Sequence, residues 1–387
     1  MLTAHDDRLL LYAKAPGTQL TGINTALLAE VSDAHLHVAL AAAPPITLHG
    51  DYLWRTDGNS PLRIRDGAAT VFFSGYEPRG HTLRRVGDGD LGFQAPPLPI
   101  MILDDPDPAA GKWIEAVWQA PGGPLVGWCH VEEPALGGKL MLPRIDWLSS
   151  VDDGLVWRWR GTLLRLPPGS AELGWRNGFF AGGFGDLCVV PDRAGRWLYL
   201  FFSSYHPREE RQGVAMLRLA ADRHEDPPDL WTRTGWNRDP ASPPMPLWPV
   251  HRGFRHRDPD SFWGPAVHYN RPLGAWVMLL NRTAGGHADF RQQGIYASLN
   301  RDIGDPQGWS PPLAIVSGGA WYPQAIGTGE GCGDTEVDAD GRFFMAGFSA
   351  WRIRFDRPRT PGVTARPLAC SPADFARLFG AGRRCPW

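Results

Sequence analysis

The chain has 387 residues and carries a formal net charge of −2 at pH 7. With 43% hydrophobic and 21% charged residues, it has the balance of an ordinary globular protein that buries a large core. The near-zero charge gives no support for a nucleic acid or an acidic membrane surface as the partner. No apolar run approaches the roughly 20 residues that span a bilayer, and the N-terminus lacks a signal-peptide pattern, so we expect a cytoplasmic protein.

Glycine, proline and tryptophan are abundant, with 46, 37 and 18 residues. So many glycines and prolines are typical of a fold with many turns. Indole rings suit either an all-β core or a cleft in which they stack on sugar rings. The five cysteines are odd in number and lack the spacing of metal ligands, so we expect neither a disulfide framework nor a zinc site.

A hairpin pattern recurs along the chain. Each unit has a short strand, a turn that contains glycine, and a longer apolar or aromatic strand. The five units are 57–78, 113–134, 185–207, 263–283 and 333–355. Candidate outer strands lie between them, at 154–166, 213–220 and 294–300.

The third unit shows the pattern most clearly. Its two strands, 187–190 and 197–202, are rich in β-branched and aromatic residues and flank the turn 192–195. Asp186 begins the first strand and His206 follows the second. The hairpin topology therefore places the acid and the histidine at the same edge of the sheet, opposite the turn.

Five such units, spaced by roughly 55 to 80 residues, predict an all-β fold, a five-bladed β-propeller with about four strands in each blade. We expect a single domain over 1–387. An N-terminal strand, at 8–14 or 26–31, should pair with the last sheet, because closure removes exposed strand edges. The alternative fold is a β-sandwich with repeated hairpins.

Acidic residues recur where the first strand of a unit begins. In a propeller these strands line the central axis, so their N-terminal ends converge. They carry Asp57, Glu115 and Asp186 in the first three units, and Asp334 in the fifth. Structural roles are the alternative: Asp57 and Asp334 adjoin glycine as turn residues do, and Asp186 could accept backbone N–H groups where its strand begins. Glu115 lies within a strand and could be purely structural.

Converging carboxylates indicate a chemical use, because like charges held together raise one another's pKa and disfavour folding. Cleavage of a glycosidic bond uses such a pair. One protonated carboxyl acts as acid, and an ionised one acts as base or nucleophile. We therefore expect a glycoside hydrolase with Asp57, Glu115 and Asp186 as its catalytic carboxylates, in a pocket at this end of the axis.

Further residues near the starts of the units are candidates for substrate binding. An aromatic side chain there can overhang the axis and stack on a sugar ring. The candidates are Asp51, Trp54, Trp113, Trp263, His268, Tyr322, Arg282 and Asp334. His268 fits a core histidine equally well, and each aromatic side chain could instead pack blade against blade.

The five-unit pattern, with one acid at the start of each of the first three inner strands, resembles the five-bladed propeller glycoside hydrolases. This group includes arabinanases, xylosidases and invertase-like enzymes. The segment RDPDSFWGPAVHYNRPLGAWVMLLNR, residues 257–282, is similar to a strand pair of these enzymes. Its Arg257-Asp258-Pro259 matches the RDP triplet of the invertase-like members. The triplet precedes the fourth unit here and belongs to the second blade there, so Asp258 takes no catalytic role.

By this resemblance, the first blade supplies a carboxylate base or nucleophile, the second an acid that tunes pKa values and orients, and the third the general acid. The matching positions are Asp57, with Asp51 as its alternative, then Glu115 and Asp186. The family has Asp in the second place and Glu in the third. This chain has the reverse, which leaves the division of roles between Glu115 and Asp186 open.

Other functions fit a propeller of this composition. A non-catalytic carbohydrate-binding propeller would share the tryptophan-rich rim, a glycoside phosphorylase would need cationic groups over the cleft, and a protein-interaction propeller fits the long loops. We expect a carbohydrate as the partner, no metal in the site and no cofactor. A structural Ca²⁺ in the central channel is compatible with these expectations. The oligomeric state stays open at this point.

Overall fold

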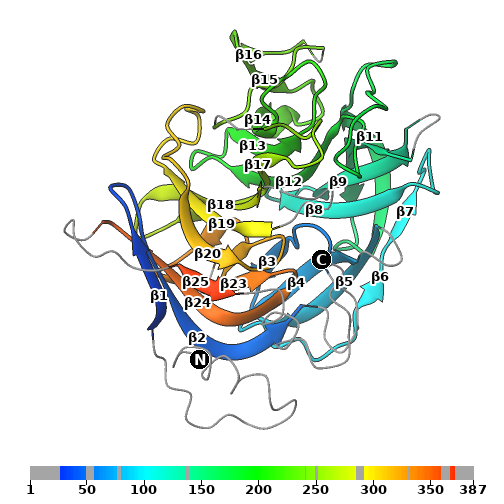
Figure 1. Ribbon diagram of the computed structural model, residues 1–387. Coiled ribbons are helices and arrows are strands. Elements are labelled where there is room, and N and C mark those ends of the chain that lie inside the picture. The colour runs from blue at the N-terminus through cyan, green and yellow to red at the C-terminus, as the bar shows by residue number, and fades with distance from the viewer. Residues whose placement is uncertain are drawn as a thin grey trace.

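The computed structural model describes residues 27–48, 56–75, 80–135, 139–239, 241–248, 252–284, 292–329, 331–358 and 367–370. Their strands form five sheets, which Figure 1 shows as a ring that the chain follows in order. The predicted five-bladed β-propeller is therefore confirmed, whereas the single domain over 1–387 stays a prediction. No helix within the described ranges is long and apolar enough to cross a membrane.

The first three sheets are consecutive along the chain, and the strands of each sheet are named in order from the axis outward. Blade one contains β3 (Leu62–Arg65), β4 (Ala68–Gly75), β5 (His81–Asp88) and β6 (Leu98–Pro99). Blade two contains β8 (Gly111–Gln119), β9 (Leu125–Pro134), β10 (Met141–Ser150), β11 (Val156–Leu164) and β7 (Met101–Leu103). Blade three contains β12 (Phe184–Pro191), β13 (Trp197–Ser204), β14 (Gly213–Ala220), β15 (Asp229–Thr232) and β16 (Gly235–Asn237), with the 3₁₀ helix η1 (Ala221–Arg223) after β14.

The last two sheets each include a strand from a distant part of the chain. Blade four contains β22 (Glu336–Val337), β17 (Asp260–Asn270), β18 (Ala275–Ala284), β19 (Gln292–Asn300), β20 (Leu313–Gly318) and β25 (Leu368–Cys370). Blade five contains β21 (Gln324–Gly327), β23 (Asp340–Met345), β24 (Phe348–Asp356), β2 (His37–Thr47) and β1 (Leu27–Ser32). The predicted outer strands correspond to β11, β14 and β19.

The hairpin predicted in the third unit is formed by β12 and β13, which pair in antiparallel register. Asp192 closes its turn, because Oδ1 accepts the N–H of Arg196 at 2.7 Å and that of Trp197 at 3.1 Å. Gly195 has a φ of 64°, a left-handed conformation that glycine adopts without strain. Local turn chemistry thus fixes this hairpin, as the sequence predicts.

One hydrophobic cluster fills each junction between neighbouring blades. Pairs of members, one from each blade, are Phe72 and Trp157, Val126 and Leu200, Phe201 and Met278, Val277 and Ile353, and Phe344 and Phe73. The junction between blades five and one has its own hydrophobic cluster, as the other four junctions do. The ring is therefore closed by side-chain packing all the way round, and a sandwich of two facing sheets is excluded.

Two N-terminal strands complete the fifth blade. Strand β2 pairs antiparallel with β24, from His37 opposite Asp356 to Thr47 opposite Phe348, and β1 pairs with β2. Figure 1 shows these strands in blue beside the orange strands of the C-terminal part. The predicted closing strand at 26–31 overlaps β1, and the alternative at 8–14 lies outside the described residues.

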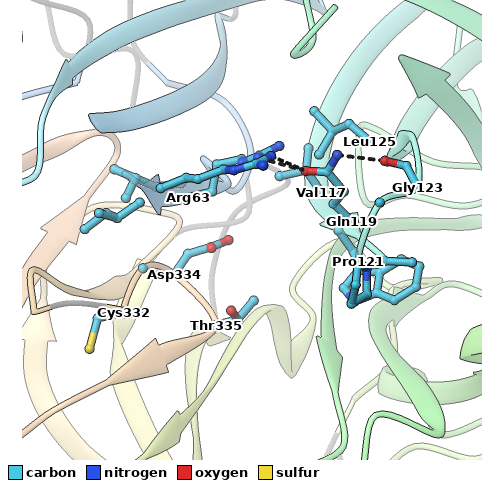
Figure 2. Close-up of a pocket in the computed structure, with 17 residues that line it drawn as sticks. Arg63, Val117, Gln119, Pro121, Gly123, Leu125, Cys332, Asp334 and Thr335 are labelled. Carbon is cyan, nitrogen blue, oxygen red and sulfur yellow. Dashed lines mark hydrogen bonds between the residues drawn. The ribbon is translucent and has the colours of Figure 1, made fainter. Parts of the chain in front are cut away.

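The inner strand of the fifth blade differs from the predicted one. Strand β21 lies at the inner edge of this sheet, whereas β22 pairs in parallel with β17 of blade four. Asp334 therefore does not begin an inner strand. Its backbone N–H bonds to the carbonyl of Leu62, and it lines a pocket of about 640 Å³ together with β3 and the C-terminal end of β8 (Figure 2).

Candidate active site

Asp186 lies at a β-bulge near the start of β12. The register with β13 shifts between Gly185 and Leu187, and Asp186 has a φ of 44°. A bulge re-aims a side chain out of the regular ladder, at a cost in backbone strain. A Cβ at Gly185 would lie 2.6 Å from the ring of His130, so only glycine allows this approach.

Two tyrosines hold the carboxylate of Asp186. The hydroxyl of Tyr205 donates to Oδ2 at 2.8 Å, and that of Tyr322 lies 3.1 Å from Oδ1. The same Tyr322 hydroxyl lies 3.3 Å from Oδ1 of Asp57. One hydroxyl has one proton to donate. If Tyr322 donates to Asp186, a protonated Asp57 must donate to Tyr322 for both contacts to be hydrogen bonds.

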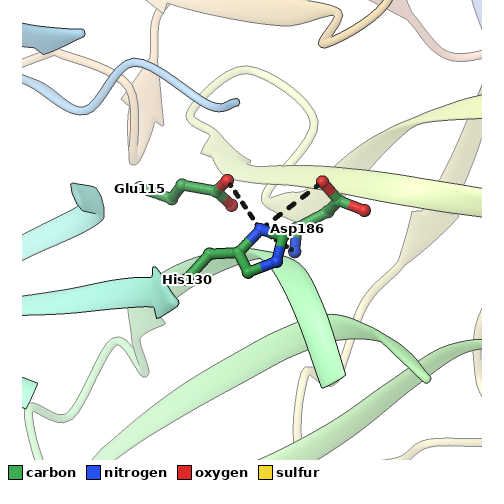
Figure 3. A group of neighbouring side chains, drawn as sticks. All are labelled: Glu115, His130 and Asp186. Atoms are coloured by element: carbon green, nitrogen blue, oxygen red, sulfur yellow. Dashed lines mark hydrogen bonds and ion pairs between the residues drawn. The ribbon is translucent and has the colours of Figure 1, made fainter. Parts of the chain in front are cut away.

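The imidazole of His130 lies among further carboxylates in the interior (Figure 3). Its Nδ1 lies 3.6 Å from Oε1 of Glu115 and 3.9 Å from Oδ1 of Asp186, and its Nε2 lies 3.6 Å from Oε1 of Glu132. His130 and Glu132 are two residues apart on β9, so strand alternation puts both on one face. We call Asp57, Glu115, His130, Glu132 and Asp186 the acidic site.

Glu115 is covered by the chain of blade one. Its Oε2 accepts the backbone N–H of Leu187, and a Cβ at Gly58 would lie 2.7 Å from its Oε1. Gly58 has a φ of 128°, which other residues adopt only with strain. Asp57, the neighbour of Gly58, is only partly buried. Of the two, Asp57 is thus the carboxyl that a ligand can reach.

Burial and neighbouring charges shift the pKa values of three residues of the acidic site. Burial and the charges of Glu132 and Asp186 raise the pKa of Asp57 to about 7. Burial also raises the pKa of Glu115 to about 7. Burial alone would lower the pKa of His130, but the bond to Glu115 and the charge of Glu132 outweigh it and raise this pKa to about 9. Near neutral pH, the site therefore holds a cation among carboxyls that retain protons.

We expect the free energy of unfolding to fall as pH rises from 6.5 to 9. Asp57, Glu115 and His130 all have folded-state pKa values above their unfolded values, so their stabilising contribution is complete at low pH and is lost through the folded pKa values of about 7, 7 and 9. Urea unfolding at half-unit pH steps measures this slope. A flat or rising free energy across this window would contradict the assignment.

Two other histidines set the lower limit, pH 6.5, of the range over which this test is informative. Burial lowers the pKa of His206 to about 4 and that of His268 to about 3. A histidine with a lowered pKa favours folding above its unfolded value near 6.5 and opposes it as pH falls. Below pH 6.5 these two groups act against the acidic site, so the test uses the alkaline side.

An aromatic cluster adjoins the acidic site through its two tyrosines. Its buried members are Phe180, Tyr205, Phe254, Trp263 and Tyr322, and its partly buried members include Trp175, Phe179 and Trp321. Trp263 packs edge-on against Trp321 and Tyr322, with ring centroids 5.3 and 5.7 Å apart. The structure thus brings the predicted Trp263 and Tyr322 to the site. The partly exposed rings of this cluster, Trp175, Phe179 and Trp321, are ones that the sequence does not single out.

Trp113 and His268 take core positions. Trp113 is buried and packs against the His130 ring, with centroids 5.3 Å apart, so it supports the acidic site from within. His268 is 1% exposed and packs against Phe355, 5.3 Å between centroids. Its lowered pKa keeps it neutral, as expected of a core histidine. The prediction that His268 binds substrate therefore has no support in its position.

Four other predicted residues lie away from the site or outside the described residues. Arg282 is engaged on the sheet of blade four, where it bonds to Asp260 at 2.9 Å and lies over the ring of Phe262. Asp334 lines the pocket at the other ends of β3 and β8. Asp51 and Trp54 lie outside the described residues.

The donor atoms of Glu115, His130 and Asp186 all lie within 4.8 Å of one another, close enough to ligate one ion. Calcium takes six to eight oxygen ligands. This group offers two carboxylates and an imidazole nitrogen, and both oxygens of Asp186 already accept from tyrosines. The donor set therefore fits a structural Ca²⁺ poorly.

No family model matches the chain, and no curated protein matches it. Among solved structures, the chain is similar to a native arabinanase from Bacillus subtilis, with 14% identity over 78% of this chain and 94% of that one, at a TM-score of 0.41. A glycoside hydrolase matches at 11% identity over 83% and 93%, with a TM-score of 0.49. An α-L-arabinofuranosidase from Fusarium graminearum matches at 13% identity over 80% and 84%, with a TM-score of 0.45. All three are glycoside hydrolases by name, at 11 to 14% identity to this chain.

Proposed function

We propose that the chain hydrolyses a glycosidic bond at the acidic site. The observation that carries this proposal is the Tyr322 hydroxyl, which lies within hydrogen-bond distance of both Asp57 and Asp186. Such a bridge is satisfied when one carboxyl is protonated and the other ionised. Glycoside hydrolysis needs that pair, an acid for the leaving oxygen and an ionised partner for the anomeric centre.

In this proposal Asp57 is the general acid. It is the more exposed of the two carboxyls, and its pKa of about 7 keeps the proton available near neutral pH. Asp186 is the ionised base or nucleophile, because two tyrosine hydroxyls are placed to donate to it. Each of its oxygens keeps a lone pair for water or substrate. This assignment reverses the roles that the family resemblance implies for the first and third blades.

The remaining members of the acidic site act through these two. Glu115 is covered by Gly58 and held by the amide of Leu187, so it positions the bulge of Asp186 rather than touching substrate. His130 places a positive charge within 4 Å of Glu115, Glu132 and Asp186. That positive charge offsets part of the free-energy cost of burying several carboxylates close together.

The proposal is tested by assaying the whole chain on a panel of aryl glycosides that includes pentofuranosides, xylosides and galactosides. Hydrolysis of at least one member, independent of added inorganic phosphate, supports it. Binding of a saccharide without cleavage of any member would favour the carbohydrate-binding alternative. Cleavage that requires phosphate would favour a phosphorylase, for which Arg282 is an unsuitable anion ligand because it is already paired with Asp260.

Replacing Tyr322 with Phe should shift the alkaline limb of the pH profile of kcat/KM to lower pH. In the bridge, Asp57 donates its proton to the Tyr322 hydroxyl, which in turn donates to Asp186. Without that acceptor the protonated form of Asp57 is less stable, so Asp57 loses its proton at lower pH. Asp186 loses one of its two donors, which we expect to reduce kcat by about tenfold. Steady-state rates from pH 4 to 9 measure both effects. Tyr269→Phe, on a partly buried residue in blade four, is the control. An unshifted alkaline limb would contradict the bridge.

A further inference from the structure

A pocket lies at the other end of the axis from the acidic site, and we call it the distal pocket. It has a volume of about 640 Å³, within the range of small-molecule sites. Its walls are strand β3, the C-terminal end of β8, the turn 120–123 that follows β8, and the segment 331–335. Figure 2 shows Arg63 and Gln119 on one side and Asp334 and Thr335 on the other.

A layer of buried polar side chains separates the distal pocket from the acidic site. Asn59 donates to the carbonyl of Leu187 at 2.8 Å and to that of Pro265 at 2.7 Å, which links blades one, three and four across the axis. Gln324 of blade five binds the backbone of Ser60 at both N–H and carbonyl. A ligand in the distal pocket is therefore not in contact with Asp57 or Asp186.

The two walls of the distal pocket offer opposite hydrogen-bonding chemistry. Arg63 donates to Oε1 of Gln119 at 2.9 Å, and Gln119 donates to the carbonyl of Gly123 at 2.8 Å, so this wall is fixed in place. Arg65 reaches the same Oε1 at 3.4 Å. Facing them, the Asp334 carboxylate points into the space between the walls (Figure 2).

The charges on these walls are unevenly compensated. Arg63 lies 3.4 Å from Asp153, and Arg65 lies 3.4 Å from Asp66, so both cations already have acidic partners. Asp334 makes no ion pair with any described residue, and burial raises its pKa to about 7. The pocket therefore presents neither a strong net positive nor a strong net negative charge to a ligand.

We propose that the distal pocket is a second, non-catalytic binding site for a neutral saccharide. A sugar hydroxyl both donates and accepts, so one ring can donate to Asp334 and accept from the guanidinium groups opposite. The partly exposed Trp118 and the adjacent Pro121 line the same pocket and offer apolar surface to a ring face. The inference concerns binding alone and goes beyond the proposed hydrolysis.

The test is calorimetric titration of the full chain with arabinotriose, xylotriose and β-1,3-galactotriose, in an Asp57→Asn background that suppresses turnover. Asp334→Asn and Gln119→Ala should each weaken one saccharide-binding event by at least about tenfold. Asp338→Asn is the matched control, because this exposed acid follows the segment 331–335 by three residues and lies outside the lining. It should leave every event unchanged.

Three outcomes would overturn the proposal. The first is binding that neither variant alters while both keep the melting temperature of the background. The second is no binding of any of the three trisaccharides. The third, which covers variants that fail to fold, is a crystal of the unsubstituted chain soaked with these sugars that shows density only at the acidic site. Failure of the proposed hydrolysis has a separate signature, since it is measured with the unsubstituted chain on aryl glycosides.

Discussion

Asp57→Asn is expected to lower kcat/KM by at least about 10²-fold on glycosides with poor leaving groups, and by much less on dinitrophenyl glycosides. A general acid contributes roughly 10² to 10⁴ in rate by protonating the departing oxygen. A dinitrophenolate departs without that proton, so the loss of the acid matters little. The dependence of rate on leaving-group pKa therefore identifies the acid directly.

Asp186→Asn should instead lower the rate by at least about 10²-fold on both kinds of substrate, because a base or nucleophile is needed whatever the leaving group. Asp340→Asn, which changes an exposed carboxylate on β23, serves as the control for the charge change. If Asp186→Asn were rescued by the dinitrophenyl leaving group and Asp57→Asn were not, the two roles would be exchanged. Near-parent rates in both variants would remove the chemistry from the acidic site altogether.

His130→Leu should lower the free energy of unfolding by about 3–5 kcal/mol at pH 8, the usual cost of removing one partner from a buried charge pair. Leucine fills most of the volume but leaves Glu115, Glu132 and Asp186 without the cation that lies among them. The loss should be larger at pH 5. The folded-state pKa of His130 is about 9, so its stabilising contribution is complete below the unfolded value near 6.5 and is partly lost at pH 8.

His268→Leu is the matched control for that experiment. His268 is equally buried and lies in an inner strand, but it packs against Phe355 and its lowered pKa keeps it neutral. We expect a loss of about 1 kcal/mol or less at pH 8. The loss should be smaller still at pH 5, because the substitution removes a histidine whose lowered pKa opposes folding below pH 6.5. Chemical denaturation of both variants at pH 5 and pH 8 measures these changes in the free energy of unfolding. An equal loss in both would mean that shape, not charge, makes His130 important.

The blades could be predicted from the sequence where their signals are local. Asp192 and Gly195 mark a turn whose hydrogen bonds lie within five residues, and the flanking strands are rich in β-branched and aromatic side chains. Strand β21 could not be recognised in the same way. It has four residues, Gln324–Gly327, and finds its partner β23 only after a connection that contains another strand, β22.

The residues of the acidic site likewise include some that the sequence predicts and one that it does not. Asp57 and Asp186 were predicted together because the inner strands of a propeller run in one direction, and their N-terminal ends must meet. His130 was missed because it lies in the second strand of its blade. Its ring reaches Asp186 only through the space left by Gly185, a contact between blades two and three that no local pattern encodes.

The division of roles also depended on contacts that a sequence does not show. Tyr322 was predicted as a stacking platform for a sugar. In the structure its hydroxyl lies between Asp57 and Asp186, and its ring is buried against Trp263. A residue chosen for its aromatic face thus contributes its single proton to the site instead.

The pairing of β2 with β24 has a consequence for folding during synthesis on the ribosome. These strands lie about 300 residues apart in the chain, so at the usual 5 to 20 residues per second β2 leaves the ribosome roughly 15 to 60 s before its partner exists. During that interval the N-terminal hairpin has an unpaired, apolar edge that can template aggregation. We therefore expect chaperone capture of residues 37–47 during synthesis to raise the yield of folded protein.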